Sequence, residues 1–206
     1  RMTKRGIESL DDPSGLLLAD RQAGVPGSAV VAVLEGHRPV LVEVQALVSP
    51  RPAGSGGFGT RTVTGLVPRR IDLILAVLAQ RAQLDLSSAD VFVSVAGGLT
   101  VREPAADLAI AAAVVSSATL RAVPGDVMML GEVGLTGELR SVPEPSRRIS
   151  EAARLGFSRI VAPRDRSVRP AGGEVEWARS ARLQQVATLG EAMHAMSLQD
   201  AGLRAV

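Results

Sequence analysis

The segment that most limits the possible folds of this chain is VFVSVAGGLTVREPAADLAIAAAVVSS, residues 91–117. An apolar run ends at Gly97 and Gly98, a short loop follows, and a helix begins at Pro104. This helix is apolar on nearly every side, so other elements have to cover it all round. The run before it is expected to be a strand buried on at least one face. The segment therefore predicts a central helix beside a sheet.

Strand and helix patterns alternate along the rest of the chain and predict a single α/β domain. Two β-branched runs in residues 28–49 are joined by EGHRP, which indicates a hairpin, and residues 68–83 have helical spacing behind Pro68. The other predicted elements are strands in 60–67, 158–163 and 174–177, two short strands around a glycine turn in 127–142, and helices in 143–157 and 189–196.

The domain is expected to occupy residues 28–206, with residues 1–27 as an N-terminal linker and first strand region. The glycine-rich stretch 50–60 is too short to separate domains. The sequence leaves the role of Gly54–Gly59 open between a loop and an interface. The chain contains no cysteine, which excludes disulfides, thiolate metal sites and cysteine catalysis. No apolar run reaches the ~18 residues of a membrane span, and we expect a cytoplasmic protein without membrane contact.

Arginine dominates the basic residues, because 22 of the 23 are arginine and the remaining one is Lys4. The planar guanidinium group donates two parallel hydrogen bonds to a phosphate, although genomic base composition can produce the same bias. The excess of positive charge is concentrated in residues 140–169, which contain three acidic residues and eight arginines: Arg140, Arg147, Arg148, Arg154, Arg159, Arg164, Arg166 and Arg169. We expect any surface that binds a negatively charged ligand to lie there.

A catalytic nucleophile needs a base, and the sequence offers few. His37 lies in the expected hairpin turn, His194 lies in the last predicted helix, and Lys4 lies in the N-terminal segment. Arginine does not release its proton near neutral pH. Neither a histidine nor Lys4 is therefore expected to act as a base.

The acidic residues Glu103 and Asp107 flank the helix entrance at i, i+4 and suggest an acid–base pair. The alternative that we favour is that they cap free backbone amides and interact with the helix dipole. No cluster of ligands has metal-binding spacing, and neither glycine-rich stretch has the lysine and hydroxyl of a phosphate-binding loop.

Three strings together carry a family resemblance: LEGHRPVLVEVQALV, DVFVSVAGGLTVREPAADLAIAAAVVSS and GEVGLTGELRSVPEPSRRISEAARLGF. They resemble the C-terminal domain of the bacterial DNA repair protein RadA, also called Sms. That domain is similar to the proteolytic domain of Lon, an α/β fold of the ribosomal protein S5 domain 2 type. The likeness runs from Gly6 to about Pro163.

The resemblance implies a protease fold without its catalytic pair. The Lon family places its serine just after a proline at this helix entrance, where the matching residue is Ala105. Its lysine matches Ser146. We therefore expect a pseudoprotease domain that binds no cofactor of its own. The resemblance also implies that the whole protein is a hexameric branch-migration motor that acts in recombination. Its ATP, magnesium and zinc sites are expected in upstream domains that are absent from these 206 residues.

Three functions follow as alternatives. The first is sequence-independent DNA binding and ring assembly, with recombinases and other repair proteins as further partners. The second is a purely structural hexamerisation module, and the third is a Lon-like serine peptidase with an unfamiliar dyad. For the first, we predict DNA contacts from two arginine pairs at helix starts and two single arginines: Arg69, Arg70, Arg147, Arg148, Arg102 and Arg140.

Overall fold

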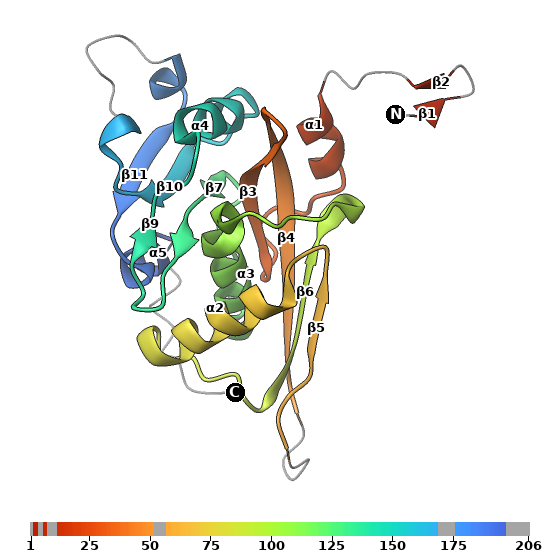
Figure 1. Cartoon of the computed structure of the whole chain (residues 1–206), viewed down its shortest axis with the longest axis vertical. Coiled ribbons are helices and arrows are strands. Elements are labelled where there is room, and N and C mark those ends of the chain that lie inside the picture. The colour runs from red at the N-terminus through yellow and green to blue at the C-terminus, as the bar shows by residue number, and fades with distance from the viewer. Residues whose placement is uncertain (1, 4–5, 8–11, 52–56, 169–175, 197–206) are drawn as a thin grey trace.

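The computed structural model describes residues 2–3, 6–7, 12–51, 57–168 and 176–196. At its centre is a mixed sheet in the strand order β11-β10-β7-β3-β4-β6-β5 (Figure 1). β3 and β4, and β4 and β6, pair antiparallel, while the other neighbours pair parallel. The strands are β3 (Ser28–Glu35), β4 (Arg38–Pro50), β5 (Arg61–Thr64), β6 (Ala89–Val95), β7 (Val127–Met129), β10 (Arg159–Pro163) and β11 (Arg182–Val186). The α/β class is thereby confirmed.

Two further strand pairs lie outside this sheet: β1 (Met2–Thr3) with β2 (Gly6–Ile7), and β8 (Glu132–Val133) with β9 (Leu139–Arg140). The helices are α1 (Pro13–Leu18), α2 (Pro68–Arg81), α3 (Asp107–Thr119), α4 (Pro145–Arg154) and α5 (Leu189–Ala195). Short 3-10 turns are formed by Ala96–Gly98, Pro104–Ala106, Arg166–Val168 and Glu176–Arg179.

Helix α3 occupies the centre that its composition predicts. Every residue from Asp107 to Ser117 is buried, and α2 and α3 cross one face of the sheet (Figure 1). Two serines near its end fix it to the sheet, because Ser116 Oγ and Ser117 Oγ accept hydrogen bonds from the N–H groups of Gly27 and Val48, both at 2.9 Å. These bonds satisfy the serine hydroxyls inside an otherwise apolar core.

The predicted hairpin is confirmed by the pairing of β3 with β4 from Ser28 opposite Gln45 to Glu35 opposite Arg38. The turn consists of Gly36 and His37, and glycine suits it because its φ is +61°. The predicted helices in 68–83, 143–157 and 189–196 and the strands in 60–67 and 158–163 are also present.

Two expectations are wrong for the residues that the structure describes. The segment 174–177 was expected to be a strand, but Glu176–Arg179 is a 3-10 turn, and 174–175 lie outside the described residues. Residues 1–27, expected to be an N-terminal linker and first strand region, include helix α1, whose buried Ser14 donates to Glu151 Oε1 at 2.9 Å and accepts from Leu41 N–H at 3.1 Å. Because α1 bonds to both α4 and β4, it belongs to the domain.

Replacing Gly27 with alanine is expected to destabilise the chain by about 2–3 kcal/mol, through backbone strain and overlap with a carbonyl. Its φ is +91°, and an added Cβ would lie 2.3 Å from Ala46 O. Gly24→Ala is the matched control, because Gly24 has a φ of +78° but an added Cβ meets no atom within 4 Å. Urea unfolding measures the stability lost in each variant. The loss in Gly24→Ala reports backbone strain, and the additional loss in Gly27→Ala reports the overlap with the carbonyl. Equal losses in the two variants would show that the structure relieves the overlap.

Candidate nucleic-acid interface

The entrance of α3 is a buried backbone junction. Ala105 and Ala106 are each 1% exposed. Gly131 N–H donates to Ala105 O at 3.0 Å, and Leu108 N–H donates to Gly131 O at 3.1 Å, which joins the entrance to the segment after β7. Ala105, which the sequence resemblance aligned with the Lon serine, therefore presents only a buried methyl group.

Arg148 is fully buried although it lies near the start of α4. Its Nη1 and Nη2 donate to the two carboxylate oxygens of Glu103 at 2.9 and 2.6 Å. Nη1 also donates to Ala32 O at 2.6 Å, and Nε donates to Pro143 O at 2.8 Å. Glu103 accepts a further bond from Leu34 N–H at 2.7 Å. The Arg148–Glu103 pair thus joins α4, β3 and the entrance of α3.

A second ion pair, between Arg70 and Asp107, lies at the start of α3. Arg70 Nε and Nη2 donate to the two oxygens of Asp107, each at 2.5 Å, and Val133 N–H donates to Asp107 Oδ2 at 3.0 Å. Arg70 also lies 3.7 Å from Glu132. Burial raises the pKa of Asp107, and the hydrogen bonds from Arg70 oppose that rise. The Asp107 carboxylate in turn raises the pKa of Arg70.

The capping interpretation of the two acidic residues is therefore wrong. Neither the 3-10 turn nor α3 has a side-chain cap. Glu103 and Asp107 accept hydrogen bonds from guanidinium groups and from the amides of Leu34 and Val133, which lie outside these two helices. A guanidinium group can bond to both oxygens of a carboxylate at once, which is stronger than a bond from one amide. No spacing in the sequence links Glu103 to Arg148, 45 residues away.

Each predicted arginine pair is split between the interior and the surface. Arg69 is exposed beside the partly buried Arg70, and Arg147 is exposed beside the fully buried Arg148. The split follows from helix geometry, because adjacent residues point about 100° apart. The inward members are held by acids, which leaves Arg148 no exposed surface for a phosphate.

The two single candidates are exposed. Arg102 directly precedes Glu103, and Arg140 donates to Glu138 at 2.5 Å from a side chain that is 59% exposed. The bonds from Thr136 and Arg140 help to lower the pKa of Glu138 to about 2. The Arg140 ion pair is solvated, so a phosphate could compete for it at little cost.

Acidic partners neutralise part of the positive charge in residues 140–169. Arg154 pairs with Asp12 and Glu151, Arg159 with Asp126 at 2.8 Å, and Arg164 with Glu191 at 3.6 Å. Hydrogen bonds from Arg159 hold the pKa of Asp126 well below its usual range. The count of arginines in this segment therefore overstates the positive charge that it presents to a ligand. Arg169 lies outside the described residues.

The other groups considered for catalysis are exposed or lie outside the described residues. Ser146, His37 and His194 are exposed, and Lys4 lies outside the described residues. Across the described part of the chain, no group of three or more His, Cys, Asp or Glu side chains could hold a metal ion. Within the same residues, no helix combines the length and apolar character needed to cross a membrane.

Comparison with known proteins identifies the family. Residues 69–166 match a family described as subunit ChlI of Mg-chelatase. The chain is 45% identical over 162 residues to the DNA repair protein RadA of Halalkalibacterium halodurans, which covers 79% of this chain and 35% of that protein. For RadA of Mycolicibacterium smegmatis the identity is 46% over 170 residues, 82% of this chain and 36% of that protein. This chain is homologous to the C-terminal part of RadA.

RadA of Listeria monocytogenes matches over a larger share of the chain, at 40% identity across 188 residues, 91% of this chain and 39% of that protein. The chain thus spans between about a third and two fifths of the length of these RadA proteins. The resemblance to RadA drawn from the sequence is confirmed. The segment matched by the ChlI family includes both arginine pairs and Ala105.

Proposed function

We propose that this chain is the DNA-binding part of a RadA-type repair protein and that Arg69, Arg102, Arg140 and Arg147 contact phosphates. The observation that carries the proposal is the split of the two helix-start pairs. Each start holds one arginine in an ion pair with a buried or partly buried carboxylate and presents the preceding arginine to solvent. The buried pairs position the helix starts, and the exposed members are free to turn toward a phosphate backbone.

Binding is proposed to be independent of base sequence. Phosphate contacts need only guanidinium groups on one surface, whereas single-strand recognition by stacking needs exposed aromatic rings. The chain has four aromatic residues, and Phe157 and Trp177 are buried at 6% and 5% exposure. Few rings are therefore available to stack on bases.

We further propose that the domain has the Lon-like, ribosomal protein S5 domain 2-type fold and does not catalyse peptide cleavage. The buried methyl group of Ala105 and the exposed position of Ser146 support this proposal. No cofactor is assigned to this chain. In the whole protein we propose ATP-driven branch migration on a hexameric ring, with ATP, magnesium and zinc bound by other domains.

The second candidate is a structural module in which the same arginines bind acidic residues of a neighbouring subunit. Their exposure fits either function. Light scattering combined with DNA binding separates the two, because the structural module forms a ring that does not retain DNA at low salt.

The Arg69→Ala/Arg147→Ala double variant is expected to bind DNA more weakly by roughly tenfold for each arginine, since a hydrogen bond to a charged group contributes about 1.5 kcal/mol. The slope of log K against log salt should decrease in magnitude by about 2 on duplex DNA. Fluorescence anisotropy with a labelled oligonucleotide measures both quantities. Arg182→Ala, an exposed arginine on β11, is the matched control. A double variant with unchanged affinity and slope would remove these two residues from the interface.

A further inference from the structure

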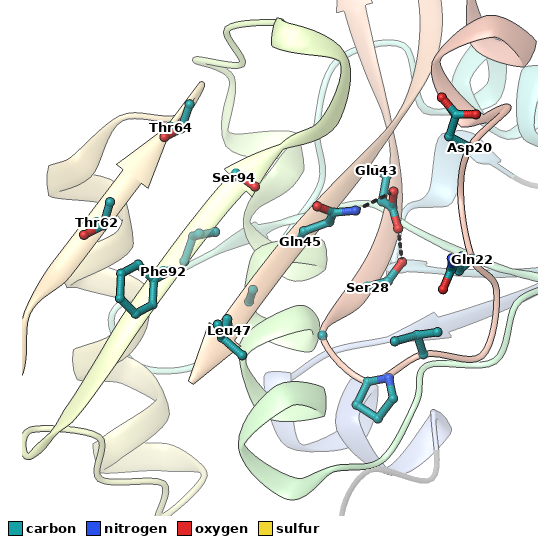
Figure 2. A pocket seen from close by; sticks show the side chains of 15 residues that line it. Asp20, Gln22, Ser28, Glu43, Gln45, Leu47, Thr62, Thr64, Phe92 and Ser94 are labelled. Carbon is teal, nitrogen blue, oxygen red and sulfur yellow. Dashed lines mark hydrogen bonds between the residues drawn. The ribbon is translucent and has the colours of Figure 1, made fainter. Parts of the chain in front are cut away.

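A groove on the open face of strands β4, β6 and β5 has a chemistry opposite to that of the exposed arginines Arg69, Arg102, Arg140 and Arg147. It has a volume of about 570 Å³ and is bordered by the segment Asp20–Gly27 that precedes β3 (Figure 2). No lysine, arginine or histidine is among the described residues that line it. Such a groove does not suit a phosphate.

The negative charge of the groove comes from a buried carboxylate. Glu43 is 4% exposed, and its oxygens accept hydrogen bonds from Ser28 Oγ and, at 3.0 Å, from Gln45 Nε2 (Figure 2). Within the described residues Glu43 forms no ion pair. Burial lowers the pKa of Arg21, and the charge of Glu43 opposes this effect. Arg21 does not pair with Glu43, however, because its Nη1 donates to Gly125 O at 2.9 Å and its guanidinium lies over the Phe157 ring. A buried charge usually has a charged partner, whereas the hydrogen-bond donors to Glu43 among the described residues are neutral.

The bond to Glu43 fixes which atom of Gln45 faces the groove. An ionised carboxylate only accepts hydrogen bonds, so the Gln45 amide has to turn its NH₂ group toward Glu43. Its oxygen then points away from Glu43, along the open face (Figure 2). The hydroxyls of Thr62, Thr64 and Ser94 follow on the neighbouring strands. The groove therefore offers a row of hydrogen-bond acceptors.

Two apolar side chains complete this surface. Leu47 is 60% exposed and Phe92 is 39% exposed, and both lie on the same open face as Gln45 (Figure 2). An aromatic face beside acceptor oxygens suits a guanidinium group, which is planar, donates five hydrogen bonds and stacks on rings. The aliphatic part of an arginine side chain would pack on Leu47.

We propose that this groove is a docking site for an arginine side chain presented by a protein partner. The guanidinium group donates to Gln45 Oε1 and to the threonine and serine hydroxyls, stacks on Phe92, and compensates the charge of Glu43. Asp20, on the bordering segment, adds a second carboxylate. The proposal does not depend on DNA binding by the exposed arginines, because none of them lines the groove.

The test is an NMR titration of the 206-residue chain with the capped peptide acetyl-Ala-Arg-Ala-amide. The matched ligand contains citrulline, which has the shape of arginine without its charge. The arginine peptide is expected to shift the amide signals of Gln45, Thr62, Thr64, Phe92 and Ser94 and to bind roughly tenfold more tightly than the citrulline peptide. In the Phe92→Ala variant the arginine peptide should bind several-fold more weakly, while unshifted signals elsewhere show that the variant is folded.

Equal binding of both peptides, or shifts confined to residues outside the groove, would overturn the proposal. Shifts of the groove amides by a DNA oligonucleotide would also overturn it. If the same amides shift when the protein alone is concentrated, and Phe92→Ala abolishes that shift, the docked arginine belongs to a second copy of this chain.

Discussion

Replacing Arg148 with methionine is expected to destabilise the chain by about 3–5 kcal/mol, because removing one partner of a buried ion pair leaves an uncompensated charge. The charge is that of Glu103, whose carboxylate would keep, among the bonds of the described residues, the one from Leu34 N–H. The carbonyl groups of Ala32 and Pro143 would also lose a donor. Urea unfolding measures the loss, and the melting temperature should decrease by roughly 10 °C for a chain of this size.

Two controls accompany this prediction. Arg147→Met changes the exposed neighbour and should alter stability by no more than about 0.5 kcal/mol. The Glu103→Gln/Arg148→Met double variant removes both charges, so its loss should be smaller than the sum of the two single losses. Unfolding of Arg148→Met at the wild-type urea concentration would contradict the structural role of the pair.

The helices and strands that the sequence predicted correctly are those with strong periodicity or distinctive turn residues. The hairpin of β3 and β4 and the helix α2 behind Pro68 have both signals. The apolar composition of α3 predicted its central position as well. The strand β11 was missed because RLQQV is mostly polar, and its pairing with β10 depends on a parallel neighbour 23 residues earlier.

The sequence predicted the arginine pairs of the candidate site but not which arginine of each pair is exposed. Adjacent arginines at the starts of α2 and α4 were visible in the sequence. Which member of each pair turns inward depends on Glu103 and Asp107, which lie 45 and 37 residues from their partners. Local spacing contains no information about such distant ion pairs. The one indication of the groove in the sequence is that Glu43 interrupts an apolar, β-branched run. The bonds of Glu43 to Ser28 and Gln45 could not be predicted, because they depend on the register of the hairpin.

The two ion pairs connect stability to the proposed DNA contacts. Arg69 and Arg147 are presented by the same helix starts that Arg70 and Arg148 hold in place. Loss of an inward arginine should therefore weaken DNA binding indirectly, through displacement of its exposed neighbour. Loss of an exposed arginine should weaken DNA binding without changing stability.

Replacing Arg70 with methionine is expected to cost about 3 kcal/mol at pH 7, and part of this loss should be recovered at pH 5. Asp107 is 1% exposed, and burial already raises its pKa above the ordinary 3.8 while the hydrogen bonds from Arg70 lower it. Without Arg70 the pKa should rise further, so the folded state binds a proton at a higher pH than the unfolded state does. A raised folded pKa means that stability decreases as pH rises through it and returns as pH falls.

The measurement is the difference in unfolding free energy between Arg70→Met and the wild type at the two pH values, which cancels the titration of groups that do not interact with Arg70. Arg69→Met is the matched control, because its side chain is exposed and its difference should stay near zero at both values. A loss in Arg70→Met that is the same at pH 5 and pH 7 would show that Asp107 does not take up a proton. In that case the bond from Val133 N–H, together with water, would have to accommodate the charged carboxylate, and Arg70 would stabilise the chain through packing.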